Sequence, residues 1–274
     1  MYVSSLRIYP VKSTAGLGVP EAVVHPWGLE NDRRWMVVDT GGATITARVH
    51  RRLLHVTATP QRGGAITLSA PEVPPLDVEV PRRNVPVPLA MSRIESGLSA
   101  GPAADEWLSV LLDETVRLVW LDDPSRRTVD ESHGGHPGDA LNLSDAGPIL
   151  VTSTSSLDRL NDWLKKTALD RGEPPPDPLP MVRFRSNVVV DGVDEAFAED
   201  EWKLVRIGEV ELRFAEHCDR CVLPTIDPVT LDGSKEPTRT LALRRQWDHR
   251  VFFGIRLIPS TTGVVRLGDD VTIR

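Results

Sequence analysis

Prolines and glycines interrupt this chain throughout, and their distribution constrains the fold more than any other feature. The 274 residues include 23 Pro and 20 Gly, spread along the sequence and not gathered in one tract. Short runs of apolar and β-branched residues lie between them, with a turn signal about every 8–12 residues in the first third. This punctuation favours many short strands joined by turns over a helical bundle.

Size and composition are ordinary for a globular protein, with 40% hydrophobic and 26% charged residues. The length suffices for one large domain or two smaller ones. The 32 Lys and Arg against 39 Asp and Glu give a net charge of −7. This balance excludes a broad basic face for nucleic acid and argues against binding to an anionic membrane. No apolar run approaches about 18 residues and no signal peptide is evident, so we expect a cytoplasmic protein.

Most segments are predicted to be strands, and the fold class is α+β, predominantly β. Helices are expected at residues 105–112, 157–164 and 238–247, the first two with an apolar stripe on one face. Residues 122–138 are polar and rich in glycine, which predicts a mobile loop joining two halves. Residues 181–190 are expected to form one strand on which Arg183, Arg185 and Asn187 share a face.

Both cysteines lie in one short segment, where Cys218 and Cys221 are separated by Asp219 and Arg220. A neighbouring cation favours the thiolate, which is both a nucleophile and a soft metal ligand. A disulfide is disfavoured in so long a chain with two cysteines, and Pro224 stops the helix that a thioredoxin-type site needs. Zinc would require further ligands beside His217. Two buried, inert thiols remain an alternative.

Three further segments carry polar groups with two interpretations each. Lys12 and Ser13 follow the first predicted strand and can bind an anion such as phosphate, or simply be solvated. Ser153 opens a hydroxyl-rich turn before a predicted helix, which suits either an anion site or helix capping. His133 and His136 have a spacing compatible with a metal, but their glycine-rich surroundings favour a solvated loop.

Taken in order, several motifs resemble those of MOSC-domain proteins that carry an N-terminal MOSC β domain. They are YPVKS, DRRW, FRSNVVVDG, VRIGEVELRF and CDRCVLPTIDPVT. This group includes the mitochondrial amidoxime-reducing component and bacterial reductases of N-hydroxylated bases. The resemblance implies an N-terminal MOSC β-barrel domain over residues 1–121 and a β-barrel-like MOSC domain with peripheral helices over residues 122–274, with a cofactor between them.

The resemblance also implies a molybdenum cofactor, in which a pyranopterin dithiolene (molybdopterin) with a terminal phosphate holds the metal. Cys221 matches the molybdenum ligand of the family, whereas Cys218 matches a cysteine that is not a ligand. The other implied cofactor-binding residues are Lys12, Ser13 and Arg33 at the anionic end, Arg185 and Asn187 at the pterin, and also Ser153 and Arg220.

The implied activity is reduction of small N-hydroxylated substrates such as amidoximes and hydroxylamines. Electrons would come from a separate ferredoxin- or cytochrome b5-like donor protein with its reductase, because no further cysteines are present for an iron–sulfur relay. The alternative is a carrier of the cofactor or of activated sulfur, with a persulfide on Cys221. Departures from the family pattern at Pro224, in the DPVTLDG turn and at Arg256 bear on substrate preference.

Overall fold

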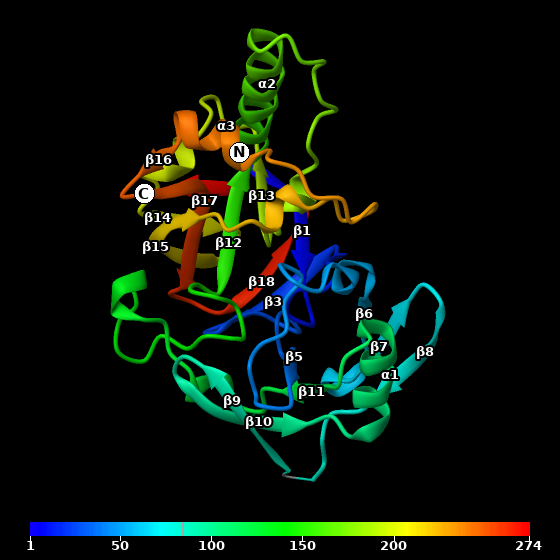
Figure 1. Cartoon of the computed structure of the whole chain (residues 1–274). Coiled ribbons are helices and arrows are strands. Elements are labelled where there is room, and N and C mark those ends of the chain that lie inside the picture. The colour runs from blue at the N-terminus through cyan, green and yellow to red at the C-terminus, as the bar shows by residue number, and fades with distance from the viewer. Residues whose placement is uncertain (84) are drawn as a thin grey trace. The chain divides into compact units, whose positions relative to one another are not determined.

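A computed structural model describes residues 1–83 and 85–274, and it is built mostly from strands, which confirms the predicted fold class. The chain divides into two compact units (Figure 1). We name them the C-terminal unit, residues 1–7, 18–26 and 147–274, and the N-terminal unit, residues 8–17 and 27–146. The sequence prediction instead placed one break after residue 121.

A nine-stranded sheet dominates the C-terminal unit, in the order β19-β14-β15-β17-β12-β13-β1-β2, with β16 paired to β17. The elements are β1 (Tyr2–Ile8), β2 (Leu17–Gly18), β3 (Glu21–His25), β12 (Ile149–Ser153), α2 (Thr154–Asp170), β13 (Val188–Asp191), β14 (Leu204–Ile207), β15 (Val210–Asp219), α3 (Thr238–Arg244), β16 (Gln246–Trp247), β17 (Arg250–Pro259), β18 (Gly263–Arg266) and β19 (Val271–Ile273).

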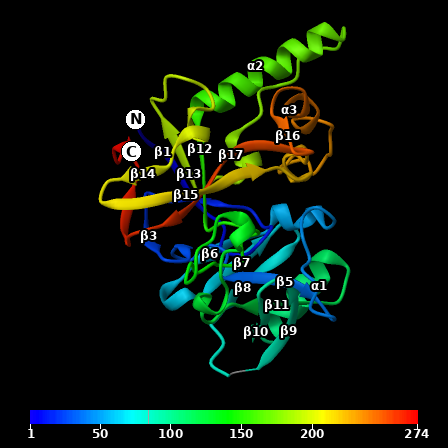
Figure 2. The same ribbon diagram turned by 90° about the vertical axis from the view of Figure 1, so that its left-hand side faces the viewer.

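Strand β17 lies in the middle of this sheet and is its most buried long strand, since most of its side chains are apolar and shielded. Helices α2 and α3 pack on one another (Figure 2) around a core of Leu160, Leu164, Phe184, Leu241 and Phe253. The first strand of the chain pairs antiparallel with β13, so the N-terminus belongs to this sheet. That pairing joins residues nearly 190 positions apart, for example Tyr2 with Asp191.

The N-terminal unit contains two smaller antiparallel sheets, β5-β11-β10-β9 and β6-β7-β8. Its elements are β4 (Gly28–Leu29), β5 (Trp35–Asp39), β6 (Thr57–Pro60), β7 (Ile66–Ala70), β8 (Val73–Val78), β9 (Pro86–Met91), β10 (Ile94–Ser99), α1 (Pro102–Leu112) and β11 (Val116–Trp120). Helix α1 begins at a proline and buries Trp107, Leu108 and Leu111, so the predicted helix at 105–112 is confirmed.

Two predicted elements have other bounds in the structure. Residues 181–190 are not one strand: Met181–Phe184 is a 3-10 turn, Arg185 has φ +58°, and β13 begins at Val188. The left-handed residue breaks the alternation, so Arg183, Arg185 and Asn187 do not share a strand face. The helix predicted at 238–247 ends at Arg244, where β16 follows.

The segment at 122–138 is ordered by its own side chains. Asp123 and Asp130 each accept a hydrogen bond from the backbone N–H two residues later, Ser125 and Ser132, and each caps a short 3-10 turn. Arg127 between these turns is only 1% exposed. The loop predicted here contains two short 3-10 turns, whose Asx caps carry the same composition as an irregular loop, and its mobility stays a prediction. Among the described residues, no helix is long and apolar enough to cross a membrane.

Candidate functional site

Cys221 lies two residues beyond the end of β15 and is exposed. Pairing with β17 continues to Arg220, whose N–H donates to the Val251 carbonyl at 2.7 Å. The chain then turns into a 3-10 turn, Leu223–Thr225, that has Pro224 near its start. The Leu223 N–H donates a long hydrogen bond to the Cys221 sulfur at 3.5 Å. The result is an accessible thiol just beyond the paired end of β15.

Cys218 has the opposite environment, since it is only 3% exposed. Arg220 donates from Nη1 to the Cys218 sulfur at 2.9 Å and from Nη2 to the Phe184 carbonyl at 2.8 Å. The same guanidinium lies 5.5 Å from the centre of the Phe184 ring. Both cysteines are free thiols. The alternative of a buried, inert thiol therefore fits Cys218, which is buried. It does not fit Cys221, which is exposed.

The Arg220 guanidinium keeps one unused donor. Its Nε is buried and has no hydrogen-bond partner among the described residues. A buried donor without a partner is costly, and such groups in native structures often mark a place for a bound ligand or ion. An exposed soft thiol next in sequence to this arginine suits a metal cofactor that carries acceptor groups.

The turn after Cys221 is closed by the side chain of Asp227. Its Oδ1 accepts from Val229 N at 2.8 Å and Thr230 N at 3.1 Å, while its Oδ2 binds Arg183 Nη2 at 2.6 Å. These bonds hold the pKa of the Asp227 carboxyl below its usual value. Arg183 is therefore engaged in holding the DPVTLDG turn.

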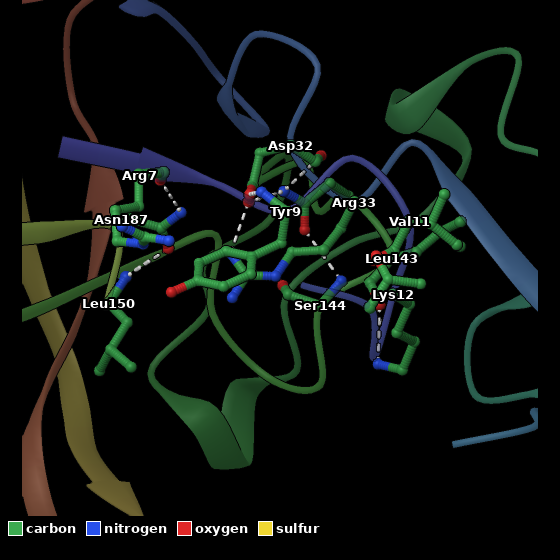
Figure 3. A network of polar contacts seen from close by, with 12 residues as sticks. Arg7, Tyr9, Val11, Lys12, Asp32, Arg33, Leu143, Ser144, Leu150 and Asn187 are labelled. Carbon is green, nitrogen blue, oxygen red and sulfur yellow. Dashed lines mark hydrogen bonds and ion pairs between the residues drawn. The ribbon is translucent and has the colours of Figure 1, made fainter. Parts of the chain in front are cut away.

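Arg185 and Asn187 lie between the 3-10 turn Met181–Phe184 and β13. Asn187 is 1% exposed and ties two chain segments together, since its Oδ1 accepts from Leu150 N and its Nδ2 donates to the Arg7 carbonyl, both at 3.1 Å (Figure 3). Arg185 has the left-handed φ noted above. Non-glycine residues in that region are uncommon and are often found at ligand sites.

Ser153 is the N-cap of α2, and its hydroxyl oxygen accepts from Ser156 N at 3.2 Å. The carboxyl group at this helix start is the protein's own Glu199, which accepts from the Ser153 hydroxyl at 2.9 Å and the Ser156 hydroxyl at 2.8 Å. Complete burial raises the pKa of Glu199, although the serine hydrogen bonds act in the other direction. The Ser153 side chain is thus engaged in capping, and its part in cofactor binding stays a prediction.

In the N-terminal unit, Lys12 is buried and its ammonium is already bound. It donates to the Leu143 carbonyl at 2.8 Å (Figure 3) and forms an ion pair with Asp145. Burial lowers the pKa of Lys12, opposed by the charge of Asp145 and reinforced by the cations Arg127 and Arg33. These causes show that Lys12, Arg33 and Arg127 form one cationic region of this unit.

Arg33 and Ser13 complete that region with an unusual backbone, φ +46° at Arg33 and +69° at Ser13. The Arg33 guanidinium lies 4.6 Å from the Tyr9 ring centre and binds Asp32 at 2.6 Å. Asp32 is completely buried and also accepts from Tyr9 N at 2.7 Å and Asn142 Nδ2 at 3.2 Å. Figure 3 shows Asp32 next to both Tyr9 and Arg33. Left-handed residues therefore occur at three predicted site positions, Ser13, Arg33 and Arg185.

Sequence reasoning did not single out Asp32, Asp145 or Glu199, which bind the predicted residues Arg33, Lys12 and Ser153. Asp32 could have been found from the sequence, because it is the first residue of the DRRW motif and directly precedes Arg33. The others could not, since Asp145 lies 133 residues from Lys12 and Glu199 lies 46 residues from Ser153. Among the described residues, no group of three or more His, Cys, Asp or Glu side chains is placed to hold a metal ion, at His133 and His136 or elsewhere.

Comparison with known proteins agrees with the motifs. Residues 1–115 match the MOSC N-terminal beta barrel domain, and residues 133–272 match the MOSC domain. The human mitochondrial amidoxime-reducing component 1 is 33% identical over 98% of this chain and 82% of its own length. The Xenopus laevis protein of that name is 32% identical over 98% of this chain and 81% of its own length. The rat mitochondrial amidoxime reducing component 2 is 33% identical, with 98% and 82% coverage.

This chain therefore belongs to the MOSC-domain family, as its motifs indicated, and it carries the family's N-terminal beta barrel domain.

Proposed function

We propose that the chain is a molybdenum-dependent reductase of N-hydroxylated compounds such as amidoximes and hydroxylamines. The observation that carries the proposal is the exposed Cys221 thiol at the end of β15, with a backbone N–H directed at its sulfur. The relatives named above as amidoxime-reducing components support the reaction class. The acidic net charge of −7 suits a separate electron donor with a basic face, of the ferredoxin or cytochrome b5 type.

The donor set fits a molybdenum cofactor. A single soft thiolate suits a thiophilic metal that brings its remaining ligands with it, as molybdopterin does through its dithiolene. When bound, the cofactor supplies a metal that accepts the substrate oxygen and passes electrons. An open metal position beside Cys221 is what catalysis at a metal requires.

The chain's own residues would bind and orient the cofactor. In the C-terminal unit, Cys221 would hold the metal, while Arg220, Arg185 and Asn187 would contact the pterin. In the N-terminal unit, Lys12, Ser13 and Arg33 would bind the terminal phosphate, which needs cationic partners and backbone N–H donors. Because Lys12 is already paired with Asp145, a phosphate there would replace that carboxylate as its partner. The Asp145 side chain is 65% exposed, so after this exchange its carboxylate would be solvated by water.

The test is reduction of benzamidoxime to benzamidine by protein expressed in a host that makes the cofactor, with a viologen radical as the artificial electron donor. We expect turnover by the wild-type protein and by Cys218→Ser, and a loss of roughly 100-fold or more in Cys221→Ser, because its metal ligand is removed. Molybdenum-loaded wild-type protein that does not reduce benzamidoxime would count against the proposal.

The exposure of Cys221 also suits a second function, a carrier of activated sulfur with a persulfide on this residue. The two functions differ in what the isolated protein holds. Intact-mass measurement of protein made with a sulfur-donating enzyme would show a reductant-sensitive addition of one sulfur atom in the carrier and none in the reductase. The addition would be lost in Cys221→Ser and retained in Cys218→Ser.

A further inference from the structure

Strand β15 becomes irregular just before it reaches Cys221. Its pairing with β17 shifts register between Phe214 and Glu216 and again between His217 and Asp219. A bulge leaves a residue outside the ladder and bends the strand. The ladder alone is therefore a weak support for the last residues of β15, the ones that place Cys221.

Arg256 on β17 contacts one carboxylate from each irregular stretch. Its Nη1 binds Glu216 at 2.5 Å and its Nη2 binds Asp219 at 2.9 Å. The side chains of Arg256 and Glu216 are only 12% and 16% exposed, whereas that of Asp219 is 38% exposed. A guanidinium is a planar fork with fixed donor directions, so one group sets the positions of both carboxylates.

The backbone and Cβ of Arg256 are enclosed by neighbouring chain segments. Arg256 is in register with Glu216 on one side and with Leu150 of β12 on the other. Its stem also packs close to Gly147, where an added Cβ would lie 2.8 Å from Arg256 Cβ. Gly147 thus leaves room for the arginine side chain to run toward β15.

The cation is permanent. Burial acts to lower the pKa of Arg256, but Cys218, Glu216 and Asp219 together raise it above its usual value. Arg220 directs a second guanidinium at Cys218. Arg256 therefore stays charged while it binds the two carboxylates of the segment that leads to Cys221.

We propose that Arg256 is a positioning residue for Cys221, acting through Glu216 and Asp219 to fix the bulged end of β15. The inference rests on the proposed function of Cys221 as a metal ligand. In this chain, the ion-pair fork makes the thiol a fixed ligand and not one carried on a loose strand end.

The experiment compares Arg256→Met with a matched variant, Arg245→Met, in the same unit. Arg245 is also a buried arginine, with a side chain 10% exposed and bound to Asp200 at 2.5 Å. It additionally donates to the carbonyl of Phe252, which lies opposite Asp219 in the ladder, so its loss disturbs β17 at the same level but leaves the ion pairs of Arg256 in place. Arg256→Lys keeps the charge but can satisfy the two carboxylates only in part, and it covers the case in which Arg256→Met does not fold.

Two readouts separate positioning from general destabilisation. The first is amide hydrogen exchange of residues 214–223 in cofactor-free protein, which we expect to accelerate roughly 10-fold or more in Arg256→Met, less in Arg256→Lys, and hardly in Arg245→Met. The second is retained molybdenum per chain, which we expect to fall roughly 10- to 100-fold in Arg256→Met alone.

Equal exchange in the Arg256 and Arg245 variants, or unchanged metal retention in Arg256→Met, would overturn the inference. The exchange readout needs no metal, so it decides the role of Arg256 in holding β15 even if the wild-type protein binds no molybdenum. In that case the proposed function fails and the structural part of the inference is judged separately.

Discussion

Cys221 and Lys12 are the two most informative polar residues of this protein, and their surroundings differ. Cys221 is exposed, and the hydrogen bond to its sulfur is long. Lys12 is buried, and both a carboxylate and a carbonyl already bind its ammonium. A metal can add to the first without displacing anything, whereas an anion at the second must exchange with Asp145. The proposed metal ligand is thus exposed to solvent, whereas the buried cation already has an anionic partner. This pairing avoids the free-energy cost of a buried charge without a counter-ion.

The largest expected effect concerns the carboxylate that pairs the cations. Asp32→Ala leaves the buried Arg33 guanidinium and Tyr9 N without their acceptor, so we expect the free energy of unfolding of the N-terminal unit to fall by about 3–5 kcal/mol. Asp145→Ala is the comparison, since its carboxylate is largely exposed and Lys12 keeps the Leu143 carbonyl as an acceptor, so its loss should cost less, about 1–2 kcal/mol. Urea unfolding measures both. Equal losses would refute the distinction between a structural and an exchangeable carboxylate.

The second-largest expected effect on stability distinguishes the two thiols, Cys218 and Cys221. Cys218→Ala removes the buried acceptor of Arg220 Nη1, and we expect a loss of about 1–3 kcal/mol in the free energy of unfolding of the C-terminal unit. Cys221→Ala should change it by less than about 0.5 kcal/mol, because the side chain is exposed. The midpoints of chemical denaturation provide the comparison. A larger loss in the Cys221 variant would reverse the roles assigned to the two cysteines.

A smaller, pH-dependent effect concerns Glu199, the carboxylate at the start of α2. Its pKa in the folded protein is raised above the usual 4.5, so the folded state binds the proton more tightly than the unfolded state does. Its contribution to stability is therefore present below pH 4.5 and is lost as the pH rises through the folded-state pKa.

Glu199→Gln removes this titration. Subtracting the variant's stability–pH curve from that of the wild type should give a difference that declines as the pH rises from about 4 to neutrality. Asp123, Asp130 and Asp227 have lowered pKa values and act in the opposite direction, but they are common to both proteins and cancel. A flat difference curve would mean that Glu199 titrates normally and is not confined by burial.

The sequence predicted the elements that local patterns encode. The apolar stripes of α1 and α2 and the order of the family motifs were sufficient for the fold class and the family. Local patterns did not predict the partners of the site residues, because those partners lie far along the chain. Leu143 binds Lys12 across 131 positions, and Arg7 meets Asn187 across 180.

Backbone conformation was the second feature that the sequence could not predict. The alternation of Arg183, Arg185 and Asn187 is typical of a strand, yet the left-handed Arg185 divides that segment into a 3-10 turn and a short strand. Arginine has no intrinsic preference for that conformation, so the sequence carries no signal of it. The capping role of Ser153 was one of two local alternatives, and it became apparent only with the distant Glu199 beside it.

The most direct test of the account is molybdenum analysis of protein made in a host that builds the cofactor, for the wild type, Cys221→Ser and Cys218→Ser. We predict about one molybdenum per chain in the wild type and in Cys218→Ser, and little in Cys221→Ser, because one soft protein thiolate holds the metal. Molybdenum retained in Cys221→Ser would contradict the assignment of the ligand. Molybdenum absent from all three, with no pterin fluorescence, would contradict the cofactor itself.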